Sequence, residues 1–68
     1  MSFNNTLVSL RNQHGMTQEQ LANAVGVSQA VISMYEGGIK VPSIFVAVKI
    51  AKTFGTTVEK LVEGNVNA

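Results

Sequence analysis

Residues 17–36 read TQEQLANAVGVSQAVISMYE, and this stretch decides the fold. Thr17 stands three residues before Gln20, which is the spacing of a capping box. In such a box the hydroxyl oxygen accepts one backbone N–H of the first turn, and the glutamine side chain reaches back to another. The pattern therefore predicts a helix that starts at Gln18 and stops at Gly26.

A second helix is expected almost immediately afterwards. Ser28 is the next N-cap candidate, because a serine oxygen can accept a free N–H of the first helical turn. In the segment 29–36 the apolar residues Val31, Ile32 and Tyr35 have the spacing of a buried helical stripe. The two helices are thus separated only by a tight turn.

The short turn between these helices places demands on the side chains around it. Ala22 is small, so the second helix can cross close to the first, and Gly26 permits the positive φ that such a turn needs. The apolar wedge between the helices is expected to comprise Leu21, Val25, Val27, Ile32 and Tyr35. The segment is therefore predicted to form a helix-turn-helix unit.

Helical periodicity continues on the N-terminal side of this unit. Leu7, Val8 and Leu10 share a helical face, and Gly15 suits the left-handed position that ends a helix. A helix is therefore expected over residues 5–14.

On the C-terminal side, Pro42 and Ser43 predict the start of a helix that runs through Phe54. Its inward stripe is expected to comprise Ala47, Ile50, Ala51 and Phe54. A last short helix over residues 58–63 follows, with Thr56 and Glu59 at capping-box spacing. Strand-like alternation is not sustained anywhere, so the sequence predicts an all-α fold, a compact bundle of five helices.

Length and composition limit the alternatives. A chain of 68 residues can enclose only one core, so a single domain over 1–68 is expected, with a core of about 5–64 and a frayed tail over 65–68. The absence of cysteine excludes disulfides and thiolate metal sites. No apolar run approaches a membrane span and the N-terminus does not resemble a signal peptide, so a cytoplasmic location is expected. The net charge of +1 does not by itself suggest a nucleic-acid partner.

The pattern of residues 10–38, LRNQHGMTQEQLANAVGVSQAVISMYEGG, resembles the Cro and lambda-repressor family of helix-turn-helix domains, also called XRE-like. The resemblance continues through PSIFVAVKIAKTFG at residues 42–55 and the short helix after it, so it covers about 5–64. It implies a lambda-repressor-like fold. It also implies that the protein is a transcriptional regulator, expected to be a repressor, which binds double-stranded operator DNA as a homodimer. Such a protein would act at the nucleoid, and it is not expected to be an enzyme.

The resemblance also assigns positions to the interface with DNA. The helix over 29–36 would lie in the major groove, and the start of the preceding helix would face the phosphate backbone. Because this helix buries its apolar stripe, the remaining side chains must face outward, and glutamine, alanine and methionine suit A·T base pairs. The residues expected to contact DNA are Thr17, Gln18, Ser28, Gln29, Ala30, Ser33, Met34, Lys40 and Ser43.

One feature departs from the family pattern. The segment 29–36 contains no lysine or arginine, and the loop after it offers only Lys40, so phosphate affinity is expected to be modest. Backbone N–H groups at helix starts, including those of Ser43 and Ile44, can donate to phosphates without carrying a charge.

The charged residues elsewhere have structural explanations. Arg11 and Glu36 occupy the positions of an ion pair in the family, and a structural role is preferred for them. His14 precedes the helix-ending glycine, where an exposed residue is expected and not a metal ligand. Glu59 and Glu63 share a helical face and suit surface charge better than acid and base chemistry. Accordingly no metal, cofactor or small-molecule ligand is expected.

An apolar cluster remains without a clear place in the core. An exposed patch of this kind in a small domain often marks a protein contact. Dimerisation is the favoured explanation, with the candidate residues Ile39, Val41, Phe45, Val58, Val62 and Val66. The alternative function is a protein-interaction module that keeps the helix-turn-helix scaffold but binds DNA weakly or not at all. The operator, the regulated genes, repression or activation, and a phage, plasmid or chromosomal origin stay open.

Overall fold

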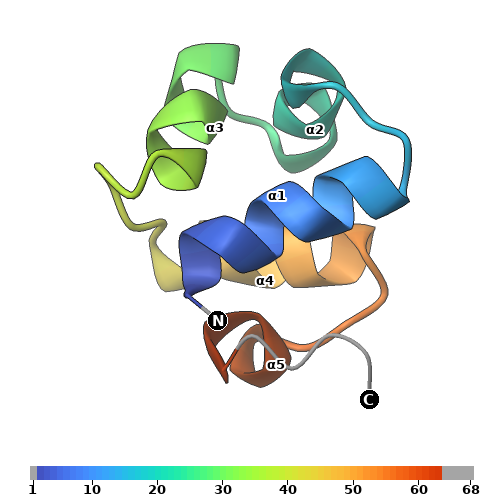
Figure 1. Ribbon diagram of the computed structural model, residues 1–68, viewed down its shortest axis with the longest axis vertical. Helices are drawn as coiled ribbons and strands as arrows, with labels where there is room; N and C mark the ends of the chain where they lie inside the picture. The colour runs from blue at the N-terminus through green and yellow to red at the C-terminus, as the bar shows by residue number, and fades with distance from the viewer. Residues whose placement is uncertain (1, 64–68) are drawn as a thin grey trace.

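The computed structural model describes residues 2–63, which form five helices and no strand (Figure 1). They are α1 (Phe3–Gln13), α2 (Gln18–Val25), α3 (Gln29–Glu36), α4 (Ile44–Thr53) and α5 (Val58–Glu63). The predicted all-α bundle is confirmed for this part of the chain.

Side-chain caps fix where the helices begin. The Thr17 hydroxyl accepts the N–H of Gln20 at 3.0 Å, and the Gln20 side chain accepts the N–H of Thr17 at 2.9 Å, so the predicted capping box is present. Ser28 accepts the N–H of Val31 at 3.2 Å and starts α3 as predicted. Both helices therefore begin where their local sequence places them.

The first helix starts two residues earlier than expected. Ser2 is its N-cap and Phe3 its first residue, whereas the sequence pattern indicated a start at Asn5. Phe3 is half-buried and packs against the core, which extends the amphipathic face beyond the periodic residues. The buried hydroxyl of Thr6 donates to the Ser2 carbonyl at 2.9 Å and ties this first turn together.

The last helix has a different cap from the one expected. Thr57, not Thr56, accepts the N–H of Lys60 at 3.1 Å, so the predicted capping box of Thr56 with Glu59 is wrong. Thr56 is engaged instead with the end of α4, where its N–H donates to the Ala51 carbonyl at 2.9 Å. This bond belongs to a left-handed glycine cap, and it leaves the next threonine to start α5.

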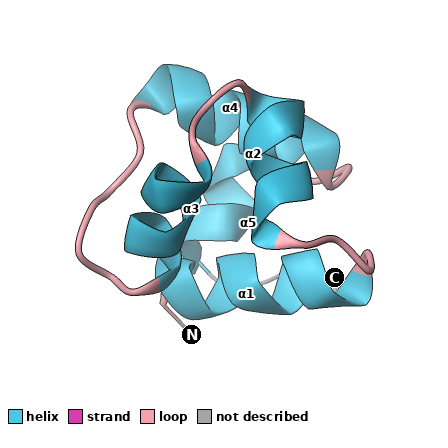
Figure 2. Ribbon diagram, turned by 90° about the horizontal axis from the view of Figure 1, so that it is seen from above, coloured by secondary structure: helices cyan, strands magenta, loops and turns pink. Residues whose placement is uncertain are grey.

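The core lies where the five helices meet. In Figure 1, α2 and α3 lie together at the top, α1 crosses in front of α4, and α5 lies at the bottom, where it contacts α4. Figure 2 shows the same helices from above and the loops that join them. The predicted inward stripe of α4 is buried throughout. The apolar core comprises Leu7, Leu10, Leu21, Ala22, Val25, Ile32, Tyr35, Ala47, Ile50, Ala51, Phe54 and Leu61. Packing of these side chains leaves the outer faces of α2 and α3 free.

Candidate nucleic-acid interface

The turn between α2 and α3 has the geometry that the sequence demands. Gly26 adopts φ +78°, which a residue with a side chain rarely adopts, and its N–H donates to the Ala22 carbonyl at 2.9 Å. The same carbonyl accepts the N–H of Val27 at 3.0 Å. These two bonds end α2, and the Ser28 cap starts α3 two residues after Gly26.

The helix α3 separates its side chains into two faces. Ile32 and Tyr35 are buried against α1 and α2, while Val31 is half-buried. The outward residues are Gln29, Ala30 and Ser33, which are exposed, and Met34, which is half-buried. A glutamine, a small methyl group and a hydroxyl thus lie on one accessible face of α3, while the opposite, apolar face is packed in the core.

Three exposed hydroxyl-bearing residues cap the starts of α2, α3 and α4. Thr17, Ser28 and Ser43 each use the hydroxyl oxygen to accept a backbone N–H of their own helix, at 3.0, 3.2 and 3.3 Å. Since a hydroxyl carries a donor as well as acceptor lone pairs, each cap keeps a proton for an external acceptor. All three are exposed, so they can donate to a phosphate without losing the cap.

Positive charge is sparse near α3. The helix contains no lysine or arginine, and the exposed Lys40 is the cation of the loop between α3 and α4. The loop turns at Gly38, whose φ is +74°. Any affinity for phosphates at this surface must therefore come largely from neutral donors.

An ion pair connects the end of α3 to α1. Arg11 Nε lies 2.6 Å from Glu36 Oε2, and Arg11 Nη2 donates to Glu36 Oε1 at 3.1 Å, so the contact is bidentate. The side chains are 16% and 7% exposed, respectively. Arg11 Nη1 also donates to the Met16 carbonyl at 2.9 Å. Hydrogen bonding to Glu36, together with its negative charge, raises the pKa of the Arg11 guanidinium against the opposing effect of burial.

Gln18 has a partner that the sequence did not reveal. Its Nε2 donates to Glu36 Oε1 at 3.1 Å, so the side chain expected to face phosphate is partly engaged within the protein. The two residues are 18 positions apart, and nothing in the local pattern of either one signals the contact. The ion pair thus extends into a network that joins α1, α2 and α3.

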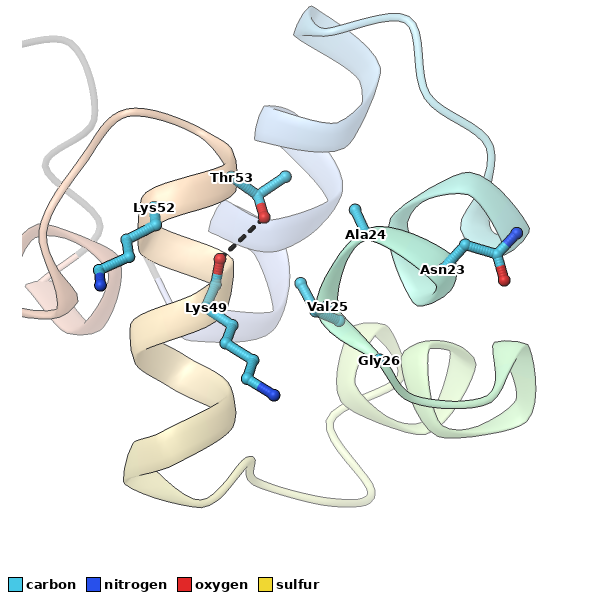
Figure 3. A pocket seen from close by; sticks show the side chains of 7 residues that line it. All are labelled: Asn23, Ala24, Val25, Gly26, Lys49, Lys52 and Thr53. Atoms are coloured by element: carbon cyan, nitrogen blue, oxygen red, sulfur yellow. Dashed lines mark hydrogen bonds between the residues drawn. The ribbon is translucent and has the colours of Figure 1, made fainter.

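Two further lysines lie on the side of the molecule where α2 meets α4. An open hollow there has a volume of about 400 Å³. Its lining residues, drawn in Figure 3, are Asn23, Ala24, Val25, Gly26, Lys49, Lys52 and Thr53. The Lys49 amine lies 3.9 Å from the position that a Cβ on Gly26 would take. A cation there is favourable because the C-terminal end of α2 carries partial negative charge. Lys49 is exposed and lies near the turn between α2 and α3, where its charge is favourable for the end of α2.

The apolar residues expected at a dimer contact differ in how far their side chains are exposed. Ile39, Val41 and Phe45 are 80%, 81% and 79% exposed, and Val62 is exposed as well. Val58 is half-buried and packs against the core, and it also lines an apolar groove beside the exposed residues, so its expected role at the dimer contact stays a prediction. Val66 lies outside the described residues.

An apolar groove lies beside these exposed residues. It has a volume of about 360 Å³ and runs between the start of α4, α5 and the first turn of α1. Its lining is formed by Phe3, Val41, Pro42, Ile44, Ala47, Val58, Leu61 and Val62. Neighbouring exposed apolar residues in a small domain often mark a protein contact.

Other kinds of site have no counterpart in residues 2–63. No group of three histidine, cysteine, aspartate or glutamate side chains comes together there in a way that could hold a metal ion. None of the helices in this part of the chain has the length and apolar character needed to cross a membrane.

Comparison with known proteins agrees with this geometry. Residues 7–61 match the helix-turn-helix family HTH_3. An HTH-type transcriptional regulator of Methanocaldococcus jannaschii, MJ0272, is 44% identical over 57 residues, which cover 84% of this chain and 86% of that protein. The chain therefore belongs to the HTH_3 helix-turn-helix family, and this membership places it among DNA-binding transcriptional regulators and not among enzymes.

A second relative is much longer than this chain. The HTH-type transcriptional activator BcrR of Enterococcus faecalis is 39% identical over 64 residues, which cover 94% of this chain but only 31% of BcrR.

Among solved structures, the P22 c2 repressor in complex with a synthetic operator has a TM-score of 0.91 at 22% identity, covering 96% of this chain and 98% of that one. At this identity the likeness establishes the fold alone.

Proposed function

We propose that this protein is a sequence-specific transcriptional repressor that binds duplex operator DNA as a homodimer, with α3 in the major groove. The observation that carries the proposal is the exposed polar face of α3, presented on a rigid apolar back. A relative described as the CTXphi transcriptional repressor RstR of Vibrio cholerae is 32% identical over 60 residues, which favours repression. The expected cytoplasmic location, in association with the nucleoid through DNA binding, stays a prediction.

Base recognition falls to the first turns of α3. Gln29 is the first residue of the helix and is exposed, so its amide can reach a base edge. A glutamine can pair in bidentate fashion with adenine N6 and N7. Ser33 can donate to or accept from a base, while Ala30 and Met34 can contact a thymine methyl group. We expect half-sites that contain A·T pairs at these positions.

We assign the phosphate contacts to the starts of α2 and α4 and to Lys40. The N–H groups of Gln18 and Glu19 precede the capped N–H of Gln20 and have no intrahelical carbonyl to reach. They lie at the positive end of α2, where an anion is favourable. Lys40 and Ser43, the cap of α4, would add contacts from the segment between α3 and α4.

Dimerisation would supply the second recognition helix. The exposed side chains of Ile39, Val41, Phe45 and Val62 support a contact between two copies, and the apolar groove gives it depth. A two-fold dimer reads two half-sites about one helical turn apart, about 10 base pairs. One α3 helix alone presents few base contacts, so two copies are needed for a specific operator.

The test starts with selection of binding sites from a pool of random duplexes. We expect enrichment of a two-fold symmetric site. Gln29→Ala should then cost about 1–3 kcal/mol of binding free energy and relax discrimination at one position of each half-site, measured on a panel of single-base variants. A Gln29→Ala protein that loses affinity uniformly over the panel would show that Gln29 does not read a base.

A second candidate function is supported by the same exposed apolar residues. With a net charge of +1, the chain could serve as a protein-interaction module that retains the scaffold. Failure to enrich any duplex at low salt, together with retention of self-association, would favour this alternative.

A further inference from the structure

The side chain of Gln18 links the start of α2 to a buried carboxylate. Gln18 is the first residue of α2 and Glu36 the last residue of α3. Glu36 Oε1 accepts from Gln18 Nε2 at 3.1 Å and from Arg11 Nη2 at 3.1 Å. Gln18 is half-buried, and the Glu36 side chain is only 7% exposed. The glutamine amide is thus held in the protein before any DNA arrives.

This contact determines which end of the amide faces inward. An ionised carboxylate only accepts hydrogen bonds, so it selects the NH₂ end of the glutamine over the carbonyl end. One N–H of that group is taken by Glu36, and the second remains available. The backbone N–H groups of Gln18 and Glu19 stand at the same helix start, so the free side-chain donor joins a local set of donors.

We propose that Glu36 is a positioning residue for DNA binding: it orients the Gln18 amide so that the remaining Nε2 N–H donates to a backbone phosphate. Arg11 completes the arrangement, because its bidentate contact neutralises a carboxylate that would otherwise repel the phosphate. A side chain that is already fixed loses less entropy on binding than a mobile one. This inference rests on the proposed function, since it requires DNA at the start of α2.

The experiment uses the full chain and a duplex of arbitrary sequence at low salt, because phosphate contacts do not depend on base sequence. Gln18→Ala is compared in three backgrounds: the parent, Glu36→Gln, which keeps an acceptor, and Glu36→Leu, which removes it. Each effect is a ratio of Kd values within one background, so the altered charge at position 36 cancels. Gln13→Ala, at an exposed glutamine in the last turn of α1, is the matched control.

We expect Gln18→Ala to weaken binding about tenfold in the parent, as for a lost hydrogen bond to a charged group. The loss should be largely kept with Glu36→Gln and nearly absent with Glu36→Leu, while Gln13→Ala changes little. An equal loss in all three backgrounds would overturn the positioning role, and so would no loss in the parent. If the parent binds no duplex at all, both the positioning role and the proposed function fail. If the parent binds but Gln18→Ala has the same effect in all three backgrounds, only the positioning role fails.

The side-chain amide signals of Gln18 give a second measurement that does not depend on whether Glu36→Leu folds. In NMR spectra of the parent, we expect these signals to differ from those of Gln13 and to remain distinct when the duplex is added. Signals of Gln18 that move to the positions of the Gln13 amide in the complex would show that the bond to Glu36 breaks on binding. That result would overturn the proposal.

Discussion

Replacing Arg11 by alanine removes three hydrogen bonds and one charge from the junction of α1 with α3. Two of the bonds reach Glu36 and the third reaches the Met16 carbonyl in the turn before α2. The remaining carboxylate is 7% exposed, so water cannot fully solvate it. Breaking a fully buried pair costs about 3–5 kcal/mol, most of it the penalty of the charge left behind.

The expected loss is smaller than that limit for two reasons. The Arg11 side chain is 16% exposed, so its removal opens a route for water, and Glu36 keeps its bond from Gln18. We therefore expect Arg11→Ala to lower the free energy of unfolding by about 2–3 kcal/mol. For a domain of this size that corresponds to a fall in Tm of roughly 10–20 °C.

Thermal and urea denaturation followed by circular dichroism measure this loss. Lys52→Ala, which removes an exposed cation from α4, is the control and should change stability by less than about 0.5 kcal/mol. An Arg11→Ala midpoint equal to that of the control would refute the reasoning. Because the pKa of Arg11 is raised in the folded state, its stabilisation is present below the unfolded pKa and is lost only as pH rises through the folded pKa. The difference between parent and variant should therefore not decline between neutral and moderately alkaline pH.

Three further predictions concern DNA, association and capping. Lys40→Ala should weaken binding to all sequences alike and reduce the salt slope by about one per protomer, and altered base preference in a duplex panel would contradict this. Phe45→Glu should shift a dimer to monomers in sedimentation without loss of helicity, whereas Asn23→Glu on α2 should not, and equal behaviour of the two would remove Phe45 from the interface. Thr57→Ala should lower the free energy of unfolding by about 1 kcal/mol and Thr56→Ala by less, because the hydroxyl of Thr57 caps α5. A larger loss for Thr56→Ala would support the capping box of Thr56 with Glu59.

The features predicted correctly are those that short-range chemistry determines. The box of Thr17 with Gln20 and the cap at Ser28 each need only residues within one helical turn. The positive φ of Gly26 likewise follows from the few residues between two helical patterns. Local signals of this kind fix the boundaries of α2 and α3, and these two helices carry the proposed site.

The features missed depend on the packing of distant segments. Thr56 and Thr57 are equally good caps in isolation, and the choice between them is made by the bond from Thr56 to the end of α4. The sequence pattern does not show that Val58, a candidate for the dimer contact, also packs against the core, because that packing depends on where α5 docks. The partner of Gln18 comes from the far end of α3, which no periodicity in the sequence indicates.

The distribution of charge has a consequence for how the proposed regulator would find its operator. Arg11 is paired with Glu36, so in residues 2–63 the exposed lysines that flank α3 are Lys40, in the loop after it, and Lys49, near Gly26 in the turn before it. Non-specific affinity for DNA arises almost entirely from cation contacts with phosphates, so it should be weak here and fall only gently with salt. The neutral donors at the starts of α2, α3 and α4 add contacts to phosphates without adding charge, so they do not steepen the salt dependence. Discrimination between operator and other DNA therefore rests on base contacts and on the spacing of two recognition helices, and it should persist at salt concentrations that release a strongly basic repressor.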